Sequence, residues 1–234
     1  MKDVEKQNPR IVALLPMKAN SERVPGKNFR EFYGKPLFRW MLDTLLSVEA
    51  IDLVVINTDA RAILESNGLS DSERVLIRDR KPEICGDMVS MNAVIGDDVS
   101  NVEADIYLMT HTTNPLVSSD TVKNALAAFQ EAREESRADS LFTVNKIQTR
   151  FYRSDGSPVN HDPDNLVRTQ DLEPWYEENS NLYIFTGHSF ASTGARIGSK
   201  PMMFETPKLE AIDIDTPEDW DFAVVAARHF MGSP

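Results

Sequence analysis

The chain is poor in the residues that build disulfides and cysteine-based metal sites. Its 234 residues include one cysteine, Cys85, and four histidines. A single thiol excludes an intrachain disulfide framework and a cysteine-based zinc site. We therefore expect Cys85 to be a small buried residue in a reduced, cytoplasmic protein. Three of the histidines, at positions 161, 188 and 229, are scattered without the spacing of metal ligands.

Positive charge and long apolar runs are also scarce. The chain has 25 lysines and arginines against 37 acidic residues, which leaves a net charge of −12. A general nucleic-acid binder needs a basic surface, so this class is excluded. No segment reaches the length of a transmembrane span, and the polar residues 1–10 lack the apolar core of a signal peptide. We expect neither nucleic acid nor a membrane as a partner, and we interpret residues 1–10 as a short lead-in.

What the sequence does have is a regular alternation of apolar runs and amphipathic segments. We predict strands at residues 11–15, 53–57, 75–77, 106–109 and 141–144, and helices at residues 36–48, 60–65, 90–102 and after a cap at Ser119 or Asp120. Strands that alternate with helices favour a parallel sheet covered on both faces. The sequence predicts one α/β domain over residues 1–234, Rossmann-like, with a mostly parallel sheet and helices on both faces.

The alternation breaks between about residues 145 and 178. This stretch is polar and holds three prolines and several aromatic residues, and its Asp155-Gly156 pair is typical of a hairpin turn. We predict a small inserted lobe here rather than a layer of the sheet. After it, strands are expected at residues 182–185 and 211–214. A last helix then begins, with Thr216 as its N-cap and Pro217 as its first residue.

A cationic loop follows the first predicted strand. Residues 15–28 hold Lys18, Arg23 and Lys27 together with Ser21 and Gly26, in a protein that is otherwise strongly acidic. Lysine and arginine bind phosphate oxygens, a serine hydroxyl can donate to them, and glycine lets the backbone approach closely. The loop therefore predicts a polyphosphate site, although the Walker A pattern is absent. A solvated surface turn is the alternative interpretation.

Two aspartates near the other end of the chain indicate a divalent cation. Asp213 and Asp215 alternate with Ile212 and Ile214, so on a strand both carboxylates would face the same side. Mg²⁺ commonly takes one or two carboxylates and leaves its other positions to water and phosphate. The alternative is that Asp215 only helps to start the helix that follows.

Two more polar segments follow predicted strands. His111 and Thr113 come directly after the strand at residues 106–109, at the sheet edge where open α/β sheets bind ligands. Arg80 follows the strand at residues 75–77, from where it can reach a nucleobase or a phosphate. The alternatives are a helix N-cap region around His111 and a solvated surface around Arg80.

These blocks, in this order, resemble the acylneuraminate cytidylyltransferase family. The resemblance covers nearly the whole chain and rests on residues 17–28 (MKANSERVPGKN), 57–59 (NTD), 80–87 (RKPEICGD), 111–117 (HTTNPLV), 179–183 (NSNLY) and 213–216 (DIDT). The last block matches the family pattern residue for residue. Glu22 and Val117 stand where family members carry a cation.

The resemblance implies a nucleotidyltransferase with the fold of the nucleotide-diphospho-sugar transferases. It would transfer CMP from CTP to the anomeric hydroxyl of an acidic, sialic acid-like 2-keto sugar and release pyrophosphate, with Mg²⁺ as cofactor, for cell-surface polysaccharide biosynthesis. The family pattern assigns catalysis to Lys18, Arg23, Lys27 and Asp215; nucleotide binding to Ser21, Asn28, Arg80 and Ser90; sugar binding to His111, Thr113, Asn179 and Tyr183; and the metal to Asp213 and Asp215.

The same resemblance makes the insertion at residues 145–178 a dimerisation lobe that reaches toward a partner's active site. We therefore expect a homodimer, with Arg150, Arg168 and Gln170 as candidates to line a neighbouring sugar site. An ordinary surface insertion is the alternative. Two rival functions stay open: a nucleotidyltransferase for a different sugar or base, and a non-catalytic nucleotide-sugar binding protein.

Overall fold

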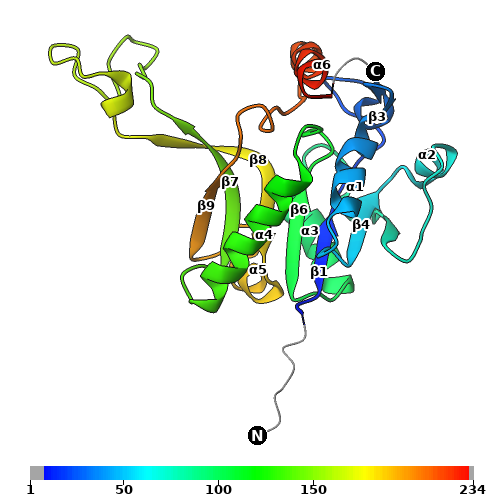
Figure 1. The fold of residues 1–234 in the computed structure, drawn as a ribbon. Helices are drawn as coiled ribbons and strands as arrows, with labels where there is room; N and C mark the ends of the chain where they lie inside the picture. Colours follow the sequence, from blue (N-terminus) through cyan, green and yellow to red (C-terminus); the bar gives the residue numbers. More distant parts are fainter. Residues whose placement is uncertain (1–7, 232–234) are drawn as a thin grey trace, which may run out of the picture.

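The computed structural model of the chain describes residues 8–231 (Figure 1), so most of the predicted lead-in, residues 1–7, lies outside the described residues. The strands are β1 (Ile11–Leu14), β2 (Glu31–Phe32), β3 (Lys35–Pro36), β4 (Leu53–Thr58), β5 (Val75–Asp79), β6 (Ile106–Thr110), β7 (Ser140–Ile147), β8 (Trp175–Phe185) and β9 (Pro201–Glu205). The α-helices are α1 (Leu37–Ser47), α2 (Arg61–Ser66), α3 (Met91–Asn101), α4 (Ser119–Glu134), α5 (Gly187–Thr193) and α6 (Pro217–Met231).

One seven-stranded sheet organises the domain, in the order β5-β4-β1-β6-β8-β7-β9. β1 is parallel to β4 and β6, β4 is parallel to β5, and β7 is parallel to β9. β8 is antiparallel to its neighbours β6 and β7. The predicted mostly parallel sheet is therefore confirmed. The loops after β1, β4 and β6 open at the same edge of the sheet, which is the upper edge in Figure 1.

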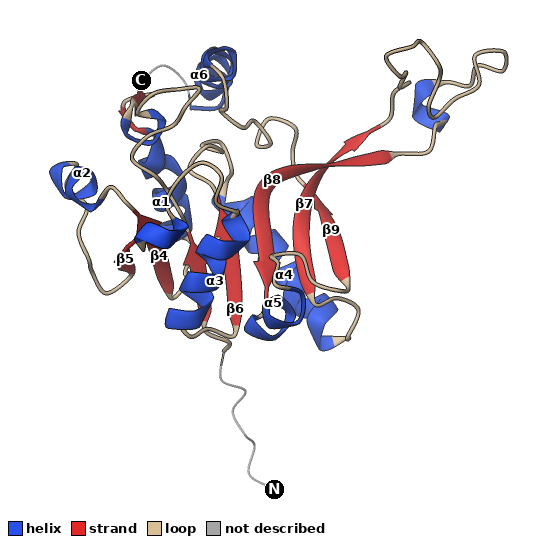
Figure 2. Ribbon diagram, turned by 180° about the vertical axis from the view of Figure 1, so that it is seen from behind, coloured by secondary structure: helices blue, strands red, loops and turns tan. Residues whose placement is uncertain are grey.

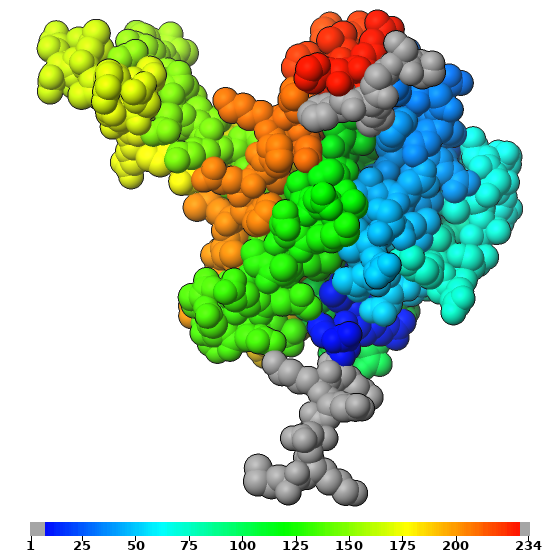
Figure 3. Space-filling model, in the orientation of Figure 1, coloured from blue at the N-terminus to red at the C-terminus, as the bar shows by residue number. Residues whose placement is uncertain are grey.

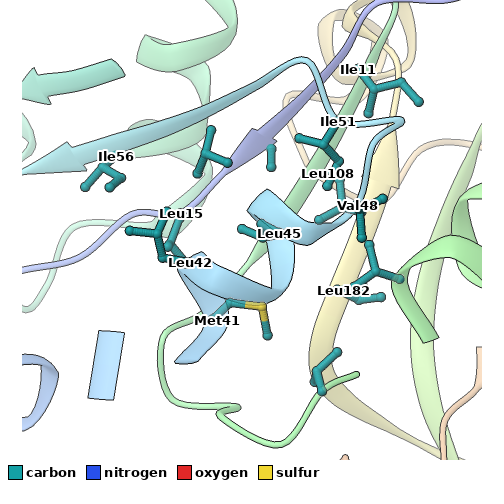
Figure 4. Close-up of a cluster of buried hydrophobic side chains, with 14 of the residues drawn as sticks. Ile11, Leu15, Met41, Leu42, Leu45, Val48, Ile51, Ile56, Leu108 and Leu182 are labelled. Atoms are coloured by element: carbon teal, nitrogen blue, oxygen red, sulfur yellow. The ribbon is translucent and has the colours of Figure 1, made fainter. Parts of the chain in front are cut away.

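Helices cover both faces of the sheet, as predicted. On one face, α1 buries Met41 and Leu45 in a cluster that includes Leu108 of β6 (Figure 4). Phe129 of α4 belongs to the same cluster. On the other face lie α3 and α5 (Figure 2), and Ile95 of α3 is fully buried there. The central strand β1 is buried along its whole length, which is why its sequence is a continuous apolar run. Within residues 8–231, no helix is both long and apolar enough to cross a membrane.

The strand predicted at residues 211–214 is wrong, because this segment is irregular. Its backbone pairs with a loop rather than with a strand. The Ile214 N–H donates to the Thr113 carbonyl at 2.9 Å, and Asn114 Nδ2 donates to the Ile212 carbonyl at 3.3 Å. The last strand of the sheet is instead β9, whose sequence PMMFE does not alternate between polar and apolar residues and so gave no strand signal.

Helix starts follow capping chemistry. Thr216 precedes α6 as predicted: its Oγ1 accepts from the Asp219 N–H at 3.2 Å, and the Asp219 carboxylate accepts from the Thr216 N–H at 2.8 Å. For α4 the prediction is wrong by one or two residues. Ser118, rather than Ser119 or Asp120, is the N-cap and accepts a backbone N–H at 3.1 Å. Consecutive polar residues that can all cap a helix explain the error.

An arm formed by residues 148–174 joins β7 to β8 and projects away from the rest of the domain (Figures 1 and 3). Its base is a pair of antiparallel strands, with Ile147 opposite Trp175. A backbone hydrogen bond of 2.8 Å closes the predicted turn around Asp155 and Gly156. The two strands thus continue into the segment predicted as an insertion, whose role in dimerisation stays a prediction.

Candidate active site

A cavity of about 470 Å³ opens at the carboxyl edge of the sheet, between the loops after β1, β5 and β6 and the segment before α6. β4 lies on one side of β1 and β6 on the other. The strand order therefore reverses at this point, where open α/β sheets usually bind ligands. In Figure 2, α3 lies in front of the sheet and α6 lies above its upper edge.

Most of the predicted site residues line this cavity. They are Lys18, Ser21, Arg23, Lys27, Asn28, Arg80, His111, Thr113, Asp213 and Asp215. The structure does not bring Ser90, Asn179 and Tyr183 into the lining. Ser90 instead caps α3, because its hydroxyl accepts from the Asn92 N–H at 3.2 Å.

The loop after β1 is held in shape by Asn28. Gly26 has a φ of 63°, a left-handed conformation in which the chain turns into the short 3₁₀ helix Lys27–Phe29. Asn28 Nδ2 donates to the Lys18 carbonyl at 2.8 Å, and Asn28 Oδ1 accepts from Thr112 Oγ1 at 2.6 Å. Both ends of the amide are therefore engaged, and Asn28 ties the cationic loop to the segment that follows β6.

The cationic loop meets the aspartate pair, although the two are nearly 190 positions apart in the sequence. Lys27 is buried, with 7% of its surface exposed, and its Nζ donates to the Ile214 carbonyl and to Asp215 Oδ1, the latter at 3.2 Å. Arg23 donates to Asp215 Oδ2 at 2.9 Å. Asp215 thus lies between two cations at the cavity, one buried and one exposed.

Asp213 is the carboxylate of the pair with unmet hydrogen-bonding capacity. Burial raises its pKa, a hydrogen bond with Thr113 opposes the rise, and the negative charge of Asp215 adds to it. Its Oδ1 atom is buried and has no hydrogen-bond partner. A divalent cation would satisfy this oxygen and relieve the repulsion between the two carboxylates.

The pair of carboxylates at this place suits Mg²⁺, which takes its other ligands from water and phosphate, better than a metal whose ligands all come from the protein. Within residues 8–231, no three side chains of His, Cys, Asp or Glu are grouped closely enough to hold a metal ion. Asp213 and Asp215 would supply two oxygen ligands, and water and phosphate would supply the others.

Arg80 lines the cavity, but most of its hydrogen bonds are made to other groups of the protein. Its Nε donates to Asn57 Oδ1 at 3.0 Å, and one terminal nitrogen donates to the carbonyls of Asn57 at 2.8 Å and Met17 at 3.1 Å. The guanidinium therefore connects the end of β4 to the start of the cationic loop. Its geometry is that of a residue that positions the loop.

A buried polar network, which the sequence analysis did not predict, orients Asn57, the main partner of Arg80. Asn57 Nδ2 donates to Asp98 Oδ1 at 2.8 Å, and Arg78 forms ion pairs with Asp98 and, at 3.0 Å, with Asp97. Asp98 is 1% exposed; burial raises its pKa, and hydrogen bonds from Asn57 and Arg78 oppose this. The available signal was the polar Asn57 at the end of an otherwise apolar strand.

His111 and Thr113 line the cavity from the loop after β6, whereas Arg80 follows β5. The pKa of His111 is lowered to about 4, first by burial and then by the positive charge of Arg196. The imidazole is therefore neutral near physiological pH and can accept or donate one hydrogen bond at each nitrogen. Thr113 also binds Asp213, so this loop connects the His111 wall to the aspartate pair.

Asn179 and Tyr183 lie behind the cavity lining rather than on it. Asn179 is buried and its Nδ2 donates to Thr206 Oγ1 at 2.6 Å. Tyr183 is fully buried, its hydroxyl donates to Glu178, and Ser180 Oγ lies 3.2 Å from the same hydroxyl oxygen. Ser180 does line the cavity, with a φ of 58°. A serine gives no sequence signal for this left-handed conformation, so this residue was missed.

The three arm residues predicted to serve a neighbouring site bind within the arm itself. Arg150 donates to the Val167 carbonyl at 2.6 Å, Arg168 pairs with Asp171 at 2.7 Å, and the backbone carbonyl of Gln170 accepts a side-chain amide at 3.2 Å. These bonds join segments of the arm to one another. A role of these residues in a partner's site stays a prediction.

The profile of a family described as cytidylyltransferase matches residues 12–224. The chain belongs to this cytidylyltransferase family. Pseudaminic acid cytidylyltransferase of Campylobacter jejuni subsp. jejuni is 24% identical to it over 221 residues, which cover 92% of this chain and 94% of that protein. CMP-N,N'-diacetyllegionaminic acid synthase of Legionella pneumophila is 26% identical over 227 residues, covering 90% and 93%. The resemblance seen in the sequence is confirmed, and the protein is a nucleotidyltransferase.

Solved structures of other cytidylyltransferases share the fold. CMP:2-keto-3-deoxy-manno-octonic acid synthetase complexed with CTP matches with a TM-score of 0.66 at 15% identity, over 95% of this chain and 100% of that one. A 4-diphosphocytidyl-2C-methyl-D-erythritol synthase from Anaerococcus prevotii matches with a TM-score of 0.66 at 13% identity, over 94% and 99%. The Rossmann-like nucleotidyltransferase fold of this cytidylyltransferase is thereby established.

Proposed function

We propose that this cytidylyltransferase transfers CMP from CTP to the anomeric hydroxyl of an acidic, sialic acid-like 2-keto sugar, with Mg²⁺ as cofactor. The observation that carries the proposal is the contact of Arg23 and Lys27 with Asp215 at the cavity, at 2.9 and 3.2 Å. Cations at this point can neutralise phosphate charge, and the adjacent carboxylates can hold a metal. The relatives named for pseudaminic and legionaminic acids support an acidic sugar as the acceptor.

In the proposed reaction, the anomeric oxygen of the sugar attacks the α-phosphorus of CTP. The bond from this phosphorus to the bridging oxygen breaks, and pyrophosphate leaves with the electron pair. The hydroxyl proton passes to solvent, because a pKa of about 4 makes His111 a weak base. The protein therefore contributes mainly positioning and charge neutralisation.

The cations of the loop would bind the triphosphate by exchanging partners. In the structure, Lys18 pairs with Asp87, and Arg23 pairs with Asp215. Both ion pairs are at least partly exposed to solvent, so breaking them costs little free energy. Phosphate oxygens then replace the carboxylates, and the Ser21 hydroxyl donates a further hydrogen bond.

Asp213 and Asp215 would hold the metal at the reacting phosphate. When bound there, Mg²⁺ would supply electrostatic stabilisation of the charge that develops on the phosphate oxygens. Lys27, held between the Ile214 carbonyl and Asp215, keeps the second carboxylate in place.

Pyrophosphate release with CTP, Mg²⁺ and a panel of acidic sugars tests this proposal. The panel contains pseudaminic, legionaminic, N-acetylneuraminic and 2-keto-3-deoxy-manno-octonic acids, with a neutral hexose and a chelator as controls. We expect release with at least one acid and none with either control. Binding of CTP without turnover on any sugar would favour a nucleotide-sugar binding protein. Faster turnover with another nucleoside triphosphate would remove the cytidylyl assignment.

The Asp215→Ala variant tests the metal assignment. We expect turnover to fall by about 100-fold or more, because one metal ligand and the partner of two cations are lost, while circular dichroism stays unchanged. Asp221→Ala, on the exposed side of α6, is the matched control. Near-full activity of the Asp215 variant at limiting Mg²⁺ contradicts the assignment.

We also propose that the protein is a homodimer that uses the arm. The arm and its base expose several large apolar side chains: Tyr152, Val159, Leu166, Val167, Trp175 and Tyr176. Apolar groups gathered on a projecting segment are typical of an interaction surface. Leu166→Glu should convert the dimer to a monomer in light scattering, whereas Val225→Glu on α6, at a site of similar exposure, should not. A wild-type monomer, or a dimer that survives Leu166→Glu, contradicts this proposal.

A further inference from the structure

Arg196 places a guanidinium beside the His111 wall of the cavity, and neither the sequence motifs nor the proposed reaction uses it. The residue lies in the connection between α5 and β9. Its Cζ lies 3.8 Å from the centroid of the Tyr183 ring, and one terminal nitrogen donates to the Tyr183 hydroxyl at 3.0 Å. Its backbone N–H donates to Asn92 Oδ1 in the first turn of α3 at 3.3 Å. The guanidinium is thus held against β8, and the backbone of the residue is fixed to α3.

Three neighbours of Arg196 lead to the cavity wall. The Tyr183 hydroxyl that it binds lies 3.2 Å from Ser180 Oγ, and Ser180 lines the cavity. The helix turn that fixes its backbone begins with Met91, which is also a lining residue. The positive charge of Arg196 lowers the pKa of His111, a third lining residue. Arg196 therefore lies directly behind the end of the cavity formed by the loop after β6 and by β8.

Arg196 has donors to spare at this place. The carboxylate with which it pairs, Glu178, is 3.6 Å away, which is longer than a hydrogen bond. Its other terminal nitrogen lies 3.9 Å from the Met109 sulfur, a weak acceptor. The side chain keeps 21% of its surface exposed, and that of Glu178 keeps 42%. A planar guanidinium with free donors matches a carboxylate, which it can bind through two parallel hydrogen bonds.

We propose that Arg196 is a specificity-determining residue that binds the carboxylate of the acidic sugar, with Tyr183 as the residue that positions it. The inference rests on the proposed function, because the carboxylate belongs to that sugar substrate. The sugar carboxylate replaces Glu178 as the partner of Arg196, and Glu178 moves into solvent. The stacked Tyr183 ring keeps the plane of the guanidinium fixed, so little side-chain freedom is lost on binding.

Steady-state kinetics of Arg196→Gln on the best acidic sugar test the inference. A hydrogen-bonded charge pair contributes enough affinity that its loss should raise the KM for the sugar by about 10- to 100-fold. The KM for CTP should stay within about twofold, because the proposed partner of Arg196 is the sugar carboxylate and not the nucleotide. Arg196→Lys, which keeps the charge but loses the fork, should lie between. The matched control is Arg39→Gln on α1, which removes another arginine stacked on an aromatic ring, that of Phe38.

Two further measurements separate recognition of the carboxylate from a structural role. Glu178→Gln should lower the KM for the acidic sugar, because it removes a competing and repelling carboxylate. The methyl ester of the sugar should be a poor substrate for the wild type, whereas Arg196→Gln should treat acid and ester alike. An Arg196→Gln variant with wild-type preference for the acid overturns the inference, as does an equal rise in both KM values.

The outcomes also separate this inference from the function on which it rests. A wild type that turns over an acidic sugar, with an Arg196→Gln variant that does so at the same KM, overturns the role of Arg196 alone. A wild type without turnover on any acidic sugar overturns the proposed function and the inference together.

Discussion

Asp213→Asn replaces a mostly buried carboxylate by an amide of nearly the same shape, and so separates the effect of this group on folding from its use in the site. The carboxylate has a buried oxygen without a partner, and burial raises its pKa. An unsatisfied buried polar group costs about 1–3 kcal/mol, and more when it is charged. Because the amide carries no charge but still needs partners, we expect the variant to be more stable by about 1 kcal/mol in the absence of metal.

That change corresponds to a rise in Tm of about 2–4 °C for a chain of this size. Turnover should change in the opposite direction. An amide oxygen is a weaker ligand than a carboxylate, and the loss of one charged ligand should lower activity by about 100-fold or more. A residue whose removal stabilises the fold and abolishes turnover is present for function.

The gain in stability of the Asp213→Asn variant over the wild type depends on pH, because the pKa of Asp213 is raised in the folded state. The ordinary pKa of 3.8 describes the unfolded chain, and the folded value lies above it. Between the two values the folded state binds more protons, so the wild type loses stability as the pH rises through this window. The gain of the variant should therefore be complete above the folded pKa of Asp213. It should vanish below pH 3.8, where the carboxyl is protonated in both states.

Thermal melts in the presence of a chelator, from neutral pH down to the lowest pH at which the fold persists, measure this dependence. Asp219→Asn is the matched control six residues farther along, on α6. Burial tends to raise the pKa of Asp219, but hydrogen bonds from Thr216 outweigh it and the pKa is lowered. Its carboxylate therefore stabilises the fold at neutral pH, and the amide should cost about 1 kcal/mol. If both variants melt earlier than the wild type, Asp213 is a structural acceptor and the reasoning is refuted.

Three more substitutions test other parts of the site. Lys27→Met removes the buried cation bonded to Asp215. We expect turnover to fall by about 100-fold and Tm to fall by several degrees. A variant that is active and as stable as the wild type contradicts this. Arg80→Lys keeps the charge but cannot hold the Met17 and Asn57 carbonyls together, so the Kd for CTP should rise by about tenfold in calorimetry, and an unchanged Kd contradicts the positioning role. His111→Gln should leave the shape of the pH–rate profile near neutrality unchanged, because the pKa of His111 is about 4, and loss of a limb there would refute that value.

The position of the site at the sheet edge could be predicted from residue types and their order. In a sheet of parallel strands, every loop after a strand opens at the same edge, so polar segments after successive strands converge without any knowledge of side-chain contacts. The cations at positions 18, 23 and 27 follow β1, and His111 and Thr113 follow β6. Their arrival at one cavity needs only the element order.

The internal partners of these residues could not be predicted in the same way. Arg80 resembles a free cation after a strand, but its acceptors are the carbonyls of Met17 and Asn57, which lie 63 and 23 positions away. Asn57 is oriented in turn by Asp98 on α3. A sequence shows that donors and acceptors exist, whereas their pairing depends on how the helices and strands are packed. For this reason Arg80, which the sequence predicts to bind the nucleotide, is instead bonded to the backbone of the loop that it positions.

The aspartate pair reaches the cavity although the strand predicted to carry it does not exist. Side chains alternate between two sides of any extended backbone, whether or not a neighbouring strand pairs with it. Ile212 and Ile214 are buried in the cluster that α6 forms with β2, and this fixes the opposite side of the segment toward the cavity. The burial of Ile212 and Ile214 is therefore what anchors the two aspartates at the site. Replacing Ile214 by a polar residue should release both Asp213 and Asp215, whereas a change at either aspartate leaves the anchor intact.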